Sequence, residues 1–416
     1  MGIFGAKREA EFDLNSQAFK RDPFPTLARM RKSGPLIRIR IPIFGKVWMA
    51  TTYESVNELL RDHARFVQSP ATAGNRGVGT LLRWLPRTLR PLTTNMLLRD
   101  EPDHRRLRSL VDQAFRRQSV EALRPRLEAL ADAAARRPGS RGGALPDGVD
   151  LLAHFARPFP LAVICEILGL PPEDRPRFTG WASNLATATS LPSLLLALHR
   201  GVRPLLSYAR EELRRQSTEP REGLIAALFQ AEEAGDRLTE DEVVAMIFLL
   251  LAAGHETTLH QITLNVLTLL DHPEQLDALK ADWSLGDSAA QELLRFVSFA
   301  QISKPRYARE PLEFQGRSIH RGEMLFACLA SANADPSVFA APDRLDLRRH
   351  PNRHVAFGTG IHHCLGAALA RAETAIALER LFTRHPRLRL AVPPEALRFS
   401  PRIGSRSLLA LPVLLG

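Results

Sequence analysis

The amino-acid sequence predicts a mainly α-helical fold with one long central helix and a small β-rich region. Two patterns indicate this fold: the longest helical signal covers residues 239–270, and strand signals are confined to residues 36–51 and 304–327. The 416 residues are 45% hydrophobic, which is enough to bury a large core. We therefore expect a single domain over residues 1–416, in which residues 1–22 form a leader segment without a membrane anchor.

The central helix has clear boundary signals. Thr239 followed by Glu242 is typical of a capping box at a helix start, and the Asp-His-Pro sequence of residues 271–273 ends the segment. At 1.5 Å per residue this helix is about 45 Å long, enough to cross the molecule. Its longest apolar run, residues 243–253, is too short for a membrane span and predicts a buried core helix.

The other predicted elements are shorter and are bounded by glycine and proline. In chain order they are a hairpin over 36–51 that turns at Gly45, helices over 103–134, 151–169 and 204–216, a Gly- and Pro-rich loop over 136–149, and short strands within 304–327 that turn at Gly316 and Gly322.

The chain is strongly basic. Lysine and arginine total 56 against 45 acidic residues, which gives a net charge of +11, and 50 of the 56 basic residues are arginine. This skew reflects either codon bias or a basic surface for an acidic partner or a phosphate. Nucleic acid is not an expected partner, because the arginines are scattered, aromatic residues are few, and no zinc-finger or RNP pattern occurs.

Cysteine is rare in this chain. Cys165, Cys328 and Cys364 are too few for a disulfide framework, and this usage fits a reducing compartment. The first residues contain no apolar run of the kind that forms a signal peptide. We therefore expect a cytoplasmic protein.

Cys364 lies in the most informative stretch, residues 357–371 (FGTGIHHCLGAALAR). It follows a glycine-rich turn and precedes an apolar helix, whose unpaired N–H groups are expected to lower the pKa of the thiol. Gly358, Gly360 and Gly366 leave space for a flat, bulky group close to the backbone. A thiolate beneath such a space suits the axial ligand of a haem iron.

Two other interpretations of this stretch stay open at the level of the residues. Cys364 could be a buried core thiol, which is the usual fate of a cytosolic cysteine. Alternatively, a zinc ion could be bound by Cys364 and the nearby histidines, although the paired spacing of structural zinc sites is missing. These histidines are His350, His354, His362 and His363.

A second group of polar residues lies within the predicted central helix. Gly254 weakens the helix by about 1 kcal/mol relative to alanine and leaves room beside it. Glu256 and Thr257 place a carboxylate and a hydroxyl where the helix should be deepest, an arrangement suited to proton delivery to a bound oxygen. Equally, Thr257 could bond the carbonyl four residues back while Glu256 points to water.

Elsewhere, Glu292 and Arg295 share a helix face, which by itself indicates only a salt bridge.

Together these segments resemble the cytochrome P-450 family of haem-thiolate monooxygenases, specifically its soluble bacterial branch. Residues 357–366 match the family pattern F-G-x-G-x-H/R-x-C-x-G, and residues 253–258 match A/G-G-x-D/E-T-T/S. Glu292 and Arg295 match E-x-x-R, and all three patterns occur in the family's order. Shorter matches at 103–108, 332–336 and 342–344 extend the resemblance over nearly the whole chain.

The resemblance implies the cytochrome P-450 fold and a haem b cofactor (iron protoporphyrin IX) whose iron is bound by Cys364. It implies that Glu256 and Thr257 are catalytic and relay protons while dioxygen is activated. The implied contacts of the haem are Phe357, Gly358, Gly366 and Gly254 around the ring, and His104, Arg108, Arg306 and His362 at the propionates. The implied structural residues behind the proximal face are Glu292, Arg295 and Arg344.

By resemblance, the protein inserts one oxygen atom of O2 into a lipophilic small molecule such as a terpenoid, a steroid, a polyketide-like compound or a fatty acid. The arginines of residues 105–117 are expected to dock an acidic ferredoxin, which is itself reduced by an NAD(P)H-dependent reductase. A haem-thiolate peroxygenase or isomerase, and a non-catalytic haem sensor or carrier, remain the alternatives. The expected pocket walls are residues 70–97, 181–200, 245–257, 297–303 and 402–408, including Leu81, Trp84, Trp181 and Val297.

Overall fold

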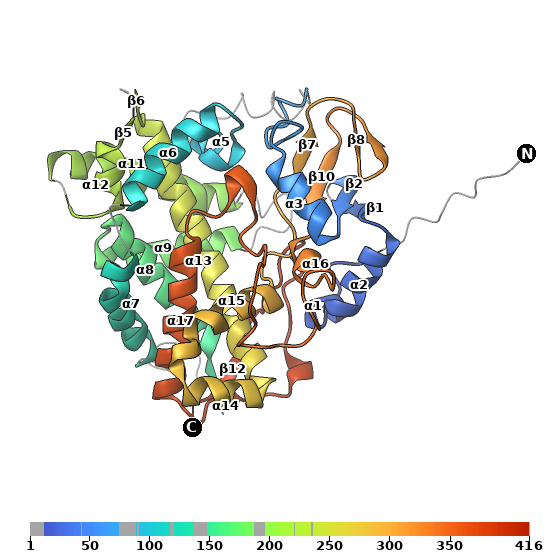
Figure 1. The fold of residues 1–416 in the computed structure, drawn as a ribbon. Coiled ribbons are helices and arrows are strands. Elements are labelled where there is room, and N and C mark those ends of the chain that lie inside the picture. Colours follow the sequence, from blue (N-terminus) through green and yellow to red (C-terminus); the bar gives the residue numbers. More distant parts are fainter. Residues whose placement is uncertain are drawn as a thin grey trace, which may run out of the picture.

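Helix α13 (Glu240–Leu270) runs through the middle of the molecule, as Figure 1 shows. Thr239 caps it: its hydroxyl accepts a hydrogen bond from the Glu242 N–H, and the Glu242 carboxylate accepts one of 2.9 Å from the Thr239 N–H. The helix ends at Asp271. The predicted central helix, its capping box and its end are therefore confirmed.

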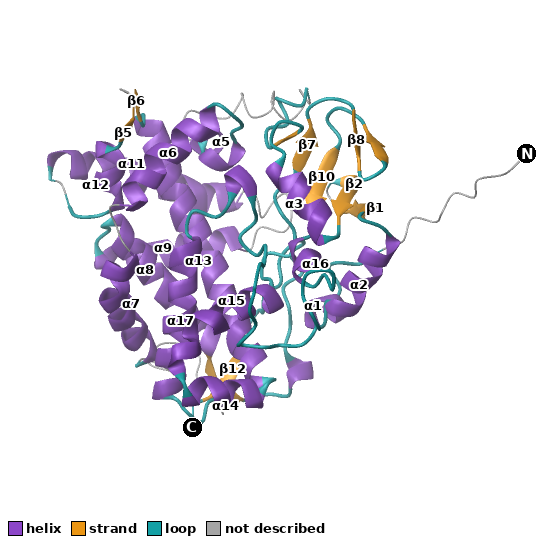
Figure 2. Cartoon of the chain, in the orientation of Figure 1, coloured by secondary structure: helices purple, strands orange, loops and turns teal. Residues whose placement is uncertain are grey.

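The computed structural model describes residues 12–42, 44–74, 89, 91–116, 120–136, 148–186, 196–219, 221–233 and 236–415. In this part of the chain, helices form the larger side of the molecule and most strands gather on the other side, as Figure 2 shows. The predicted mainly α-helical class with a small β-rich region is confirmed. The predicted loop of 136–149 lies almost entirely outside the described residues.

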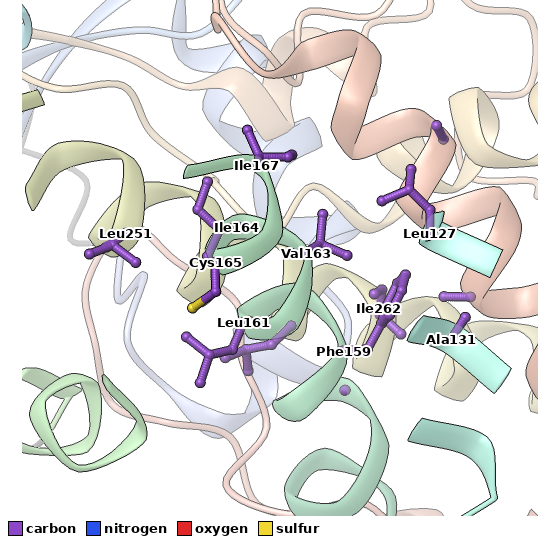
Figure 3. Close-up of a cluster of buried hydrophobic side chains, with 14 of the residues drawn as sticks. Leu127, Ala131, Phe159, Leu161, Val163, Ile164, Cys165, Ile167, Leu251 and Ile262 are labelled. Carbon is purple, nitrogen blue, oxygen red and sulfur yellow. The ribbon is translucent and has the colours of Figure 1, made fainter. Parts of the chain in front are cut away.

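Helix α8 (Pro158–Leu168) packs against α13 in the main core. Figure 3 shows Phe159, Val163 and Ile164 of α8 in one cluster with Leu251 and Ile262 of α13. Burial of such side chains contributes about 1.5–3 kcal/mol each, so this contact anchors α13 along its length. The helix ends at a left-handed glycine, as the predicted boundary at 169 requires.

The remaining helices surround this pair. The predicted helical segment over 103–134 contains α6 and α7, and residues 117–119 between them lie outside the described residues. The described helices are α1 (Gln17–Arg21), α2 (Phe24–Ser33), α3 (Tyr53–Arg61), α5 (Pro91–Thr94), α6 (Asp103–Arg116), α7 (Val120–Ala135), α9 (Arg175–Ala186), α11 (Arg203–Thr218), α12 (Leu224–Gln230), α14 (Pro273–Ala281), α15 (Gly286–Val297), α16 (Leu329–Asn333) and α17 (Ala367–Arg384), with short turns such as η3 (Leu152–Ala156), η5 (Leu198–Val202) and η7 (Gly360–His362).

The largest sheet has the strand order β1-β2-β10-β7-β3. The predicted hairpin over 36–51 is confirmed as β1 and β2, in which Leu36 pairs with Ala50 and Ile41 with Gly45. The predicted strands within 304–327 are also present, with positive φ angles at both predicted turn glycines. The strands are β1 (Leu36–Ile41), β2 (Gly45–Ala50), β3 (Phe66–Val67), β4 (Val149–Asp150), β5 (Glu232–Glu233), β6 (Asp236–Arg237), β7 (Arg306–Ala308), β8 (Leu312–Phe314), β9 (Arg317–Ile319), β10 (Met324–Ala327), β11 (Arg389–Leu390) and β12 (Pro412–Leu414).

The described structure also contains part of the predicted leader segment and one helix that is apolar enough to be considered as a membrane span. The described part of the leader, residues 12–22, contains α1 and is packed on the protein, with Lys20 fully buried. Helix α13 is the one described helix that is long and apolar enough to cross a membrane. It lies mostly inside the protein, as expected of a core helix.

Candidate functional site

The loop that carries Cys364 is closed by its own backbone. The N–H of Cys364 donates to the carbonyl of Phe357 at 3.0 Å, and the N–H of His363 donates to that of Gly360, also at 3.0 Å. Gly358 and Gly360 have φ angles of 68° and 75°, which side-chain-bearing residues rarely adopt. These bonds form the turn η7 and place Cys364 three residues before α17 begins.

Cys364 is the exposed cysteine of this chain, whereas Cys165 and Cys328 are buried. The interpretation of Cys364 as a core thiol is therefore wrong. A side chain at Gly358 or Gly366 would meet no other atom within 4 Å, so the loop borders open space on these sides. The glycines thus leave the room that a flat group beside the sulfur requires.

The expected low pKa of Cys364 is not found. Desolvation by the surrounding protein raises the pKa of this thiol. The backbone N–H of Gly366 and the positive charge of Arg108 both act in the opposite direction, but more weakly. The helix start therefore favours the thiolate as predicted, but desolvation has the larger effect on the pKa of this thiol.

Three predicted propionate partners come together beside this loop. The rings of His104 and His362 lie 4.1 Å apart, although these residues are far apart in the sequence. Both ring nitrogens of His104 and Nδ1 of His362 are buried without a hydrogen-bond partner. The nearest acid to His104, Glu101, is 3.8 Å away, which is too far for a hydrogen bond.

Arg306, on β7, adds a buried cation to this cluster. Its side chain is 5% exposed, and burial lowers its pKa to about 10. Burial and the charge of Arg306 hold the pKa of His362 well below its ordinary value, and His104 is shifted in the same direction. Buried donors without acceptors are costly, so this cluster fits an anionic ligand such as two carboxylates.

Arg108, on α6, lines the same cavity as His104 and contacts the cysteine loop. Its Nε donates to both oxygens of Asp112 at 3.0 Å, and its Nη1 donates to the carbonyl of His363 at 2.9 Å. It therefore fixes the residue next to Cys364, and its role at a propionate stays a prediction. An open cavity of about 880 Å³ lies between α6 and this loop; its lining includes Glu101, Arg105, Arg108, Ile361 and His363.

Glu292 and Arg295 form a fully buried pair on α15. The Nε and Nη2 of Arg295 each donate to one carboxylate oxygen of Glu292 at 2.8 Å. The Nη1 of Arg295 donates to the carbonyls of Asn333 and Pro342, also at 2.8 Å. Because the amide oxygen of Asn333 accepts the N–H of Val355 at 2.7 Å, the pair supports the segment that leads into the cysteine loop.

Arg344, the third predicted structural residue, takes part in this site through its backbone. Arg344 is exposed and contributes only its carbonyl, which accepts hydrogen bonds from Arg295 and Arg349. The cation that completes the site is Arg349, whose Nε donates to both oxygens of Glu292 at 3.1 Å. Asn352 adds a bond of 3.0 Å to the same carboxylate. The predicted tie to the segment around Arg344 therefore includes Arg349, which was not named in advance.

Ala253 and Thr257, one turn apart on α13, are exposed on an otherwise largely buried helix. The hydroxyl of Thr257 donates to the carbonyl of Ala253 at 2.5 Å, as in the structural alternative for this residue. A side chain at Gly254 would meet Ile164 of α8 at 3.3 Å, so the missing side chain supports helix packing. Its contact with a haem stays a prediction.

Glu256 does not simply point to water. Its carboxylate is paired with the guanidinium of Arg402, which belongs to the predicted pocket wall 402–408 but was not predicted to contact Glu256. Of the predicted pocket residues, Val297 is 1% exposed in the main core. Trp181 is partly buried and packs against Phe178 and Tyr208, and its place in a pocket wall stays a prediction. The predicted wall residues within 75–88 lie outside the described part of the chain.

Comparison with known proteins agrees with this geometry. The family described as Cytochrome P450 matches residues 197–386. A vitamin D(3) 25-hydroxylase from Pseudonocardia autotrophica is 38% identical over 414 residues, covering 98% of this chain and 97% of that protein. The mycinamicin IV hydroxylase/epoxidase of Micromonospora griseorubida is 36% identical and covers 92% and 94%. This chain belongs to the cytochrome P450 family.

Solved P450 structures match the fold as a whole. The Bacillus subtilis cytochrome P450 PksS of the bacillaene polyketide synthase superposes with a TM-score of 0.86 at 34% identity, covering 97% of this chain and 100% of that chain. P450BioI, in complex with an acyl carrier protein that carries hexadec-9Z-enoic acid, superposes with a TM-score of 0.83 at 32% identity and covers 96% and 99%. The predicted P450 fold and oxidoreductase class are therefore confirmed.

The residues of this P450 fit the haem that the family binds. The exposed thiol, the open space beside its glycines and the buried donors without acceptors are the features that an iron porphyrin with two propionates would use. The zinc interpretation finds no support, because the described residues contain no group of three or more His, Cys, Asp or Glu placed to hold a metal ion.

Proposed function

We propose that this P450 is a haem b monooxygenase that inserts one oxygen atom of O2 into a lipophilic small molecule. The observation that carries the proposal is the exposed thiol of Cys364 next to the orphaned ring nitrogens of His104 and His362. A sulfur ligand beside unpaired imidazole nitrogens and the buried cation of Arg306 matches an iron porphyrin and its propionates.

Each group of residues has a distinct task in this proposal. When bound, the haem supplies the oxygen-activating chemistry. Cys364 holds the iron, His104, Arg306 and His362 hold the propionates, and the buried pair behind the loop keeps it in place. On α13, Thr257 and Glu256 hold and move protons at the hydroxyl and the carboxylate, because these are the polar groups on the exposed side of the helix.

The ferrous carbon monoxide spectrum tests the ligand assignment. Cys364→Ala should abolish the spectral signature of a thiolate-ligated haem, whereas the matched control Cys328→Ala should retain it, because Cys328 is buried in another cluster. A wild-type protein that takes up no haem after reconstitution would contradict the proposal. If peroxide supports much faster turnover than electrons from a ferredoxin, the enzyme is instead a peroxygenase.

We propose the same substrate range as the sequence predicts: terpenoids, steroids, polyketide-like compounds or fatty acids. Relatives support this range, since one is named for vitamin D(3) and another for mycinamicin IV. A 38% identical P450 structure contains myristic acid. Optical titration with vitamin D(3), a macrolide and myristic acid should give a low-spin to high-spin shift with one class only. A panel without any shift would reject all three classes.

We propose that electrons come from an acidic ferredoxin with an NAD(P)H-dependent reductase in the cytoplasm. The side chain of Arg105 is 77% exposed at the cavity beside the cysteine loop, which suits electrostatic docking. Arg105 pairs with Glu101 at 3.0 Å, one turn away on the surface. Arg106 is less suitable, because its side chain is only 32% exposed and is paired with Glu242 of α13. The side chain of Arg116 and all of Arg117 lie outside the described structure.

Charge reversal tests this docking face. Arg105→Glu should slow reduction by an acidic ferredoxin severalfold and weaken its dependence on salt, because steering acts through charge. Arg215→Glu is a matched control, since Arg215 also pairs with an acid one turn away but lies on α11. If both variants are reduced as fast as the wild type, Arg105 does not contribute to docking.

A further inference from the structure

The carboxylate of Glu256 is hydrogen-bonded to a segment near the C-terminus. The Nη1 of Arg402 donates to Oε1 of Glu256, although the two residues are 146 positions apart. The side chain of Glu256 is 26% exposed and that of Arg402 is 39% exposed, so neither is buried in the core. An exposed pair of this kind adds little stability, which leaves the position of the carboxylate as its main consequence.

The neighbouring histidines do not supply a positive charge to Glu256. His255 is 3% exposed and bonds the carbonyl of Arg157, and burial lowers its pKa to about 4. His260, one turn beyond Glu256, stacks on Phe299, and burial together with the charges of Arg402 and Arg157 lowers its pKa to about 3. Both histidines are therefore neutral at physiological pH.

The backbone of Arg402 is held by a fully buried lysine. The Nζ of Lys20, on α1, donates to the carbonyl of Arg402 at 2.7 Å and also to that of Ser405. Burial lowers the pKa of Lys20 to about 8, so the ammonium is still charged at neutral pH. Arg406, in the same segment as Arg402, donates hydrogen bonds of 2.6 and 2.9 Å to the backbone carbonyls of Lys20 and Arg21.

Further bonds fix both sides of this segment. Gln17 and Phe399 exchange two hydrogen bonds, of 2.8 and 3.0 Å, between the side-chain amide and the backbone. On the other side, the carbonyl of Gly404 accepts the N–H of Gln301 at 2.9 Å. Residues 399–406 are therefore held between α1 and the chain that follows α15, with Arg402 projecting to α13.

We propose that Arg402 is a positioning residue that holds the Glu256 carboxylate for proton delivery, and that α1 fixes Arg402 through Lys20. This inference rests on the proposed function of Glu256. A free glutamate on a helix samples several rotamers, and a misplaced proton donor costs rate steeply. The hydrogen bond from the side chain of Arg402, whose backbone is anchored by Lys20, restricts the rotamers of Glu256.

A kinetic double-mutant cycle tests whether Arg402 acts through Glu256. Arg402→Gln should lower kcat about tenfold with KM within about twofold of the wild type, and Arg402→Lys should restore part of kcat. In a Glu256→Gln background, Arg402→Gln should cause less than about a twofold further loss. Arg398→Gln is the matched control, because this exposed arginine lies next to the segment and donates to the carbonyl of Glu395 instead of to α13 in the described part of the chain.

Hydrogen exchange of the resting protein gives a readout that does not depend on turnover. Lys20→Met should accelerate exchange of the backbone amides of residues 399–406 about tenfold, because two carbonyls lose their donor. Arg402→Gln should change the same amides by less than about twofold, since Lys20 still holds the backbone. Unchanged exchange in Lys20→Met would refute the role of α1.

The two proposals fail in different ways. If Arg402→Gln keeps the thiolate spectrum and an unchanged kcat, or if its loss is fully additive with that of Glu256→Gln, Arg402 does not position Glu256 and the monooxygenase assignment stands. If the wild type lacks the thiolate spectrum or does not turn over any lipophilic compound with O2, the proposed function itself fails.

Discussion

Arg349 and Glu292, 57 residues apart, are joined by two hydrogen bonds of 3.1 Å from a single Nε to both carboxylate oxygens. The side chain of Glu292 is fully buried and that of Arg349 is 10% exposed. With Arg295 on its other side, Glu292 is enclosed by two guanidinium groups. This arrangement links α15 to the segment that leads into the cysteine loop.

Replacement of Arg349 should therefore be costly, whereas replacement of its neighbour Arg344 should not. Arg349→Ala removes charged hydrogen bonds to a buried carboxylate and should lower the free energy of unfolding by about 2–3 kcal/mol. Arg344→Ala removes an exposed side chain whose carbonyl remains, and should change it by less than about 0.5 kcal/mol. Urea unfolding of both variants measures the difference. Equal losses would contradict the assignment of Arg349.

Patterns local in the sequence predicted their structures well. The capping box at Thr239, the hairpin turn at Gly45 and the helix end at Gly169 depend on residues a few positions apart, and all three are confirmed. The helical spacing over 103–134 is likewise local, and the structure has α6 and α7 in this segment. Pro125 lies inside α7, near its start.

Contacts between distant segments could not be predicted from spacing. The pairing of Glu256 with Arg402 joins the central helix to the C-terminal region, and that of Glu292 with Arg349 joins α15 to a segment that was predicted only as the one around Arg344. A chain with 50 arginines offers many possible partners for each acid, so residue type alone does not select one. The pKa of Cys364 also depends on desolvation, which a linear motif does not encode.

Gly360 should tolerate no side chain. At its φ of 75° a side chain would collide with the carbonyl of Leu60 on α3. Gly316, in the β8–β9 turn, has a φ of 70° but open space around it. Gly316→Ala should therefore cost about 1 kcal/mol of unfolding free energy, from backbone strain alone. Gly360→Ala should cost at least about twice as much and should also reduce haem retention.

Thermal or urea unfolding of the two alanine variants, with the haem content determined in parallel, checks this prediction. The comparison separates the strain that both sites share from the clash that only Gly360 has. If the two variants lose the same free energy and bind haem equally, the close contact between the cysteine loop and α3 is not important for the site.

Stability should fall in mild acid because of buried neutral histidines. Burial lowers the pKa of His255 from its ordinary value of 6.5 to about 4, and that of His354 likewise. Between these pH values the unfolded chain binds protons that the folded protein does not. The free energy of unfolding should therefore decrease as the pH falls from about 6.5 to about 4, by about 1.4 kcal/mol per pH unit for each histidine.

His255→Gln isolates one part of this effect. The glutamine amide can still donate to the carbonyl of Arg157, but it does not titrate. Urea unfolding between about pH 7 and pH 4.5 should show a pH dependence shallower by about one proton than that of the wild type. His199→Gln, at an exposed position, should leave the slope unchanged. An unaltered slope in His255→Gln would mean that His255 is already protonated in the folded protein.

Thr257 should matter for the use of electrons rather than for folding. Its hydroxyl lies on the exposed side of α13, where the substrate and O2 would approach. Thr257→Val keeps the shape of the side chain and removes the group that can pass on a proton. The product formed per NAD(P)H oxidised should fall roughly tenfold, and peroxide should account for the difference.

Thr263 provides the matched control for this last prediction. It lies on the same helix, and its hydroxyl donates to the carbonyl four residues back at 2.7 Å, as that of Thr257 does. Thr263 is fully buried, however, and cannot reach the open side of α13. Thr263→Val should therefore keep the yield of product per NAD(P)H. The two substitutions remove the same kind of intrahelical hydrogen bond. A loss of product yield confined to Thr257→Val therefore assigns the effect to proton transfer by the Thr257 hydroxyl. Equal product yields in both variants would show that Thr257 is not part of the proton relay.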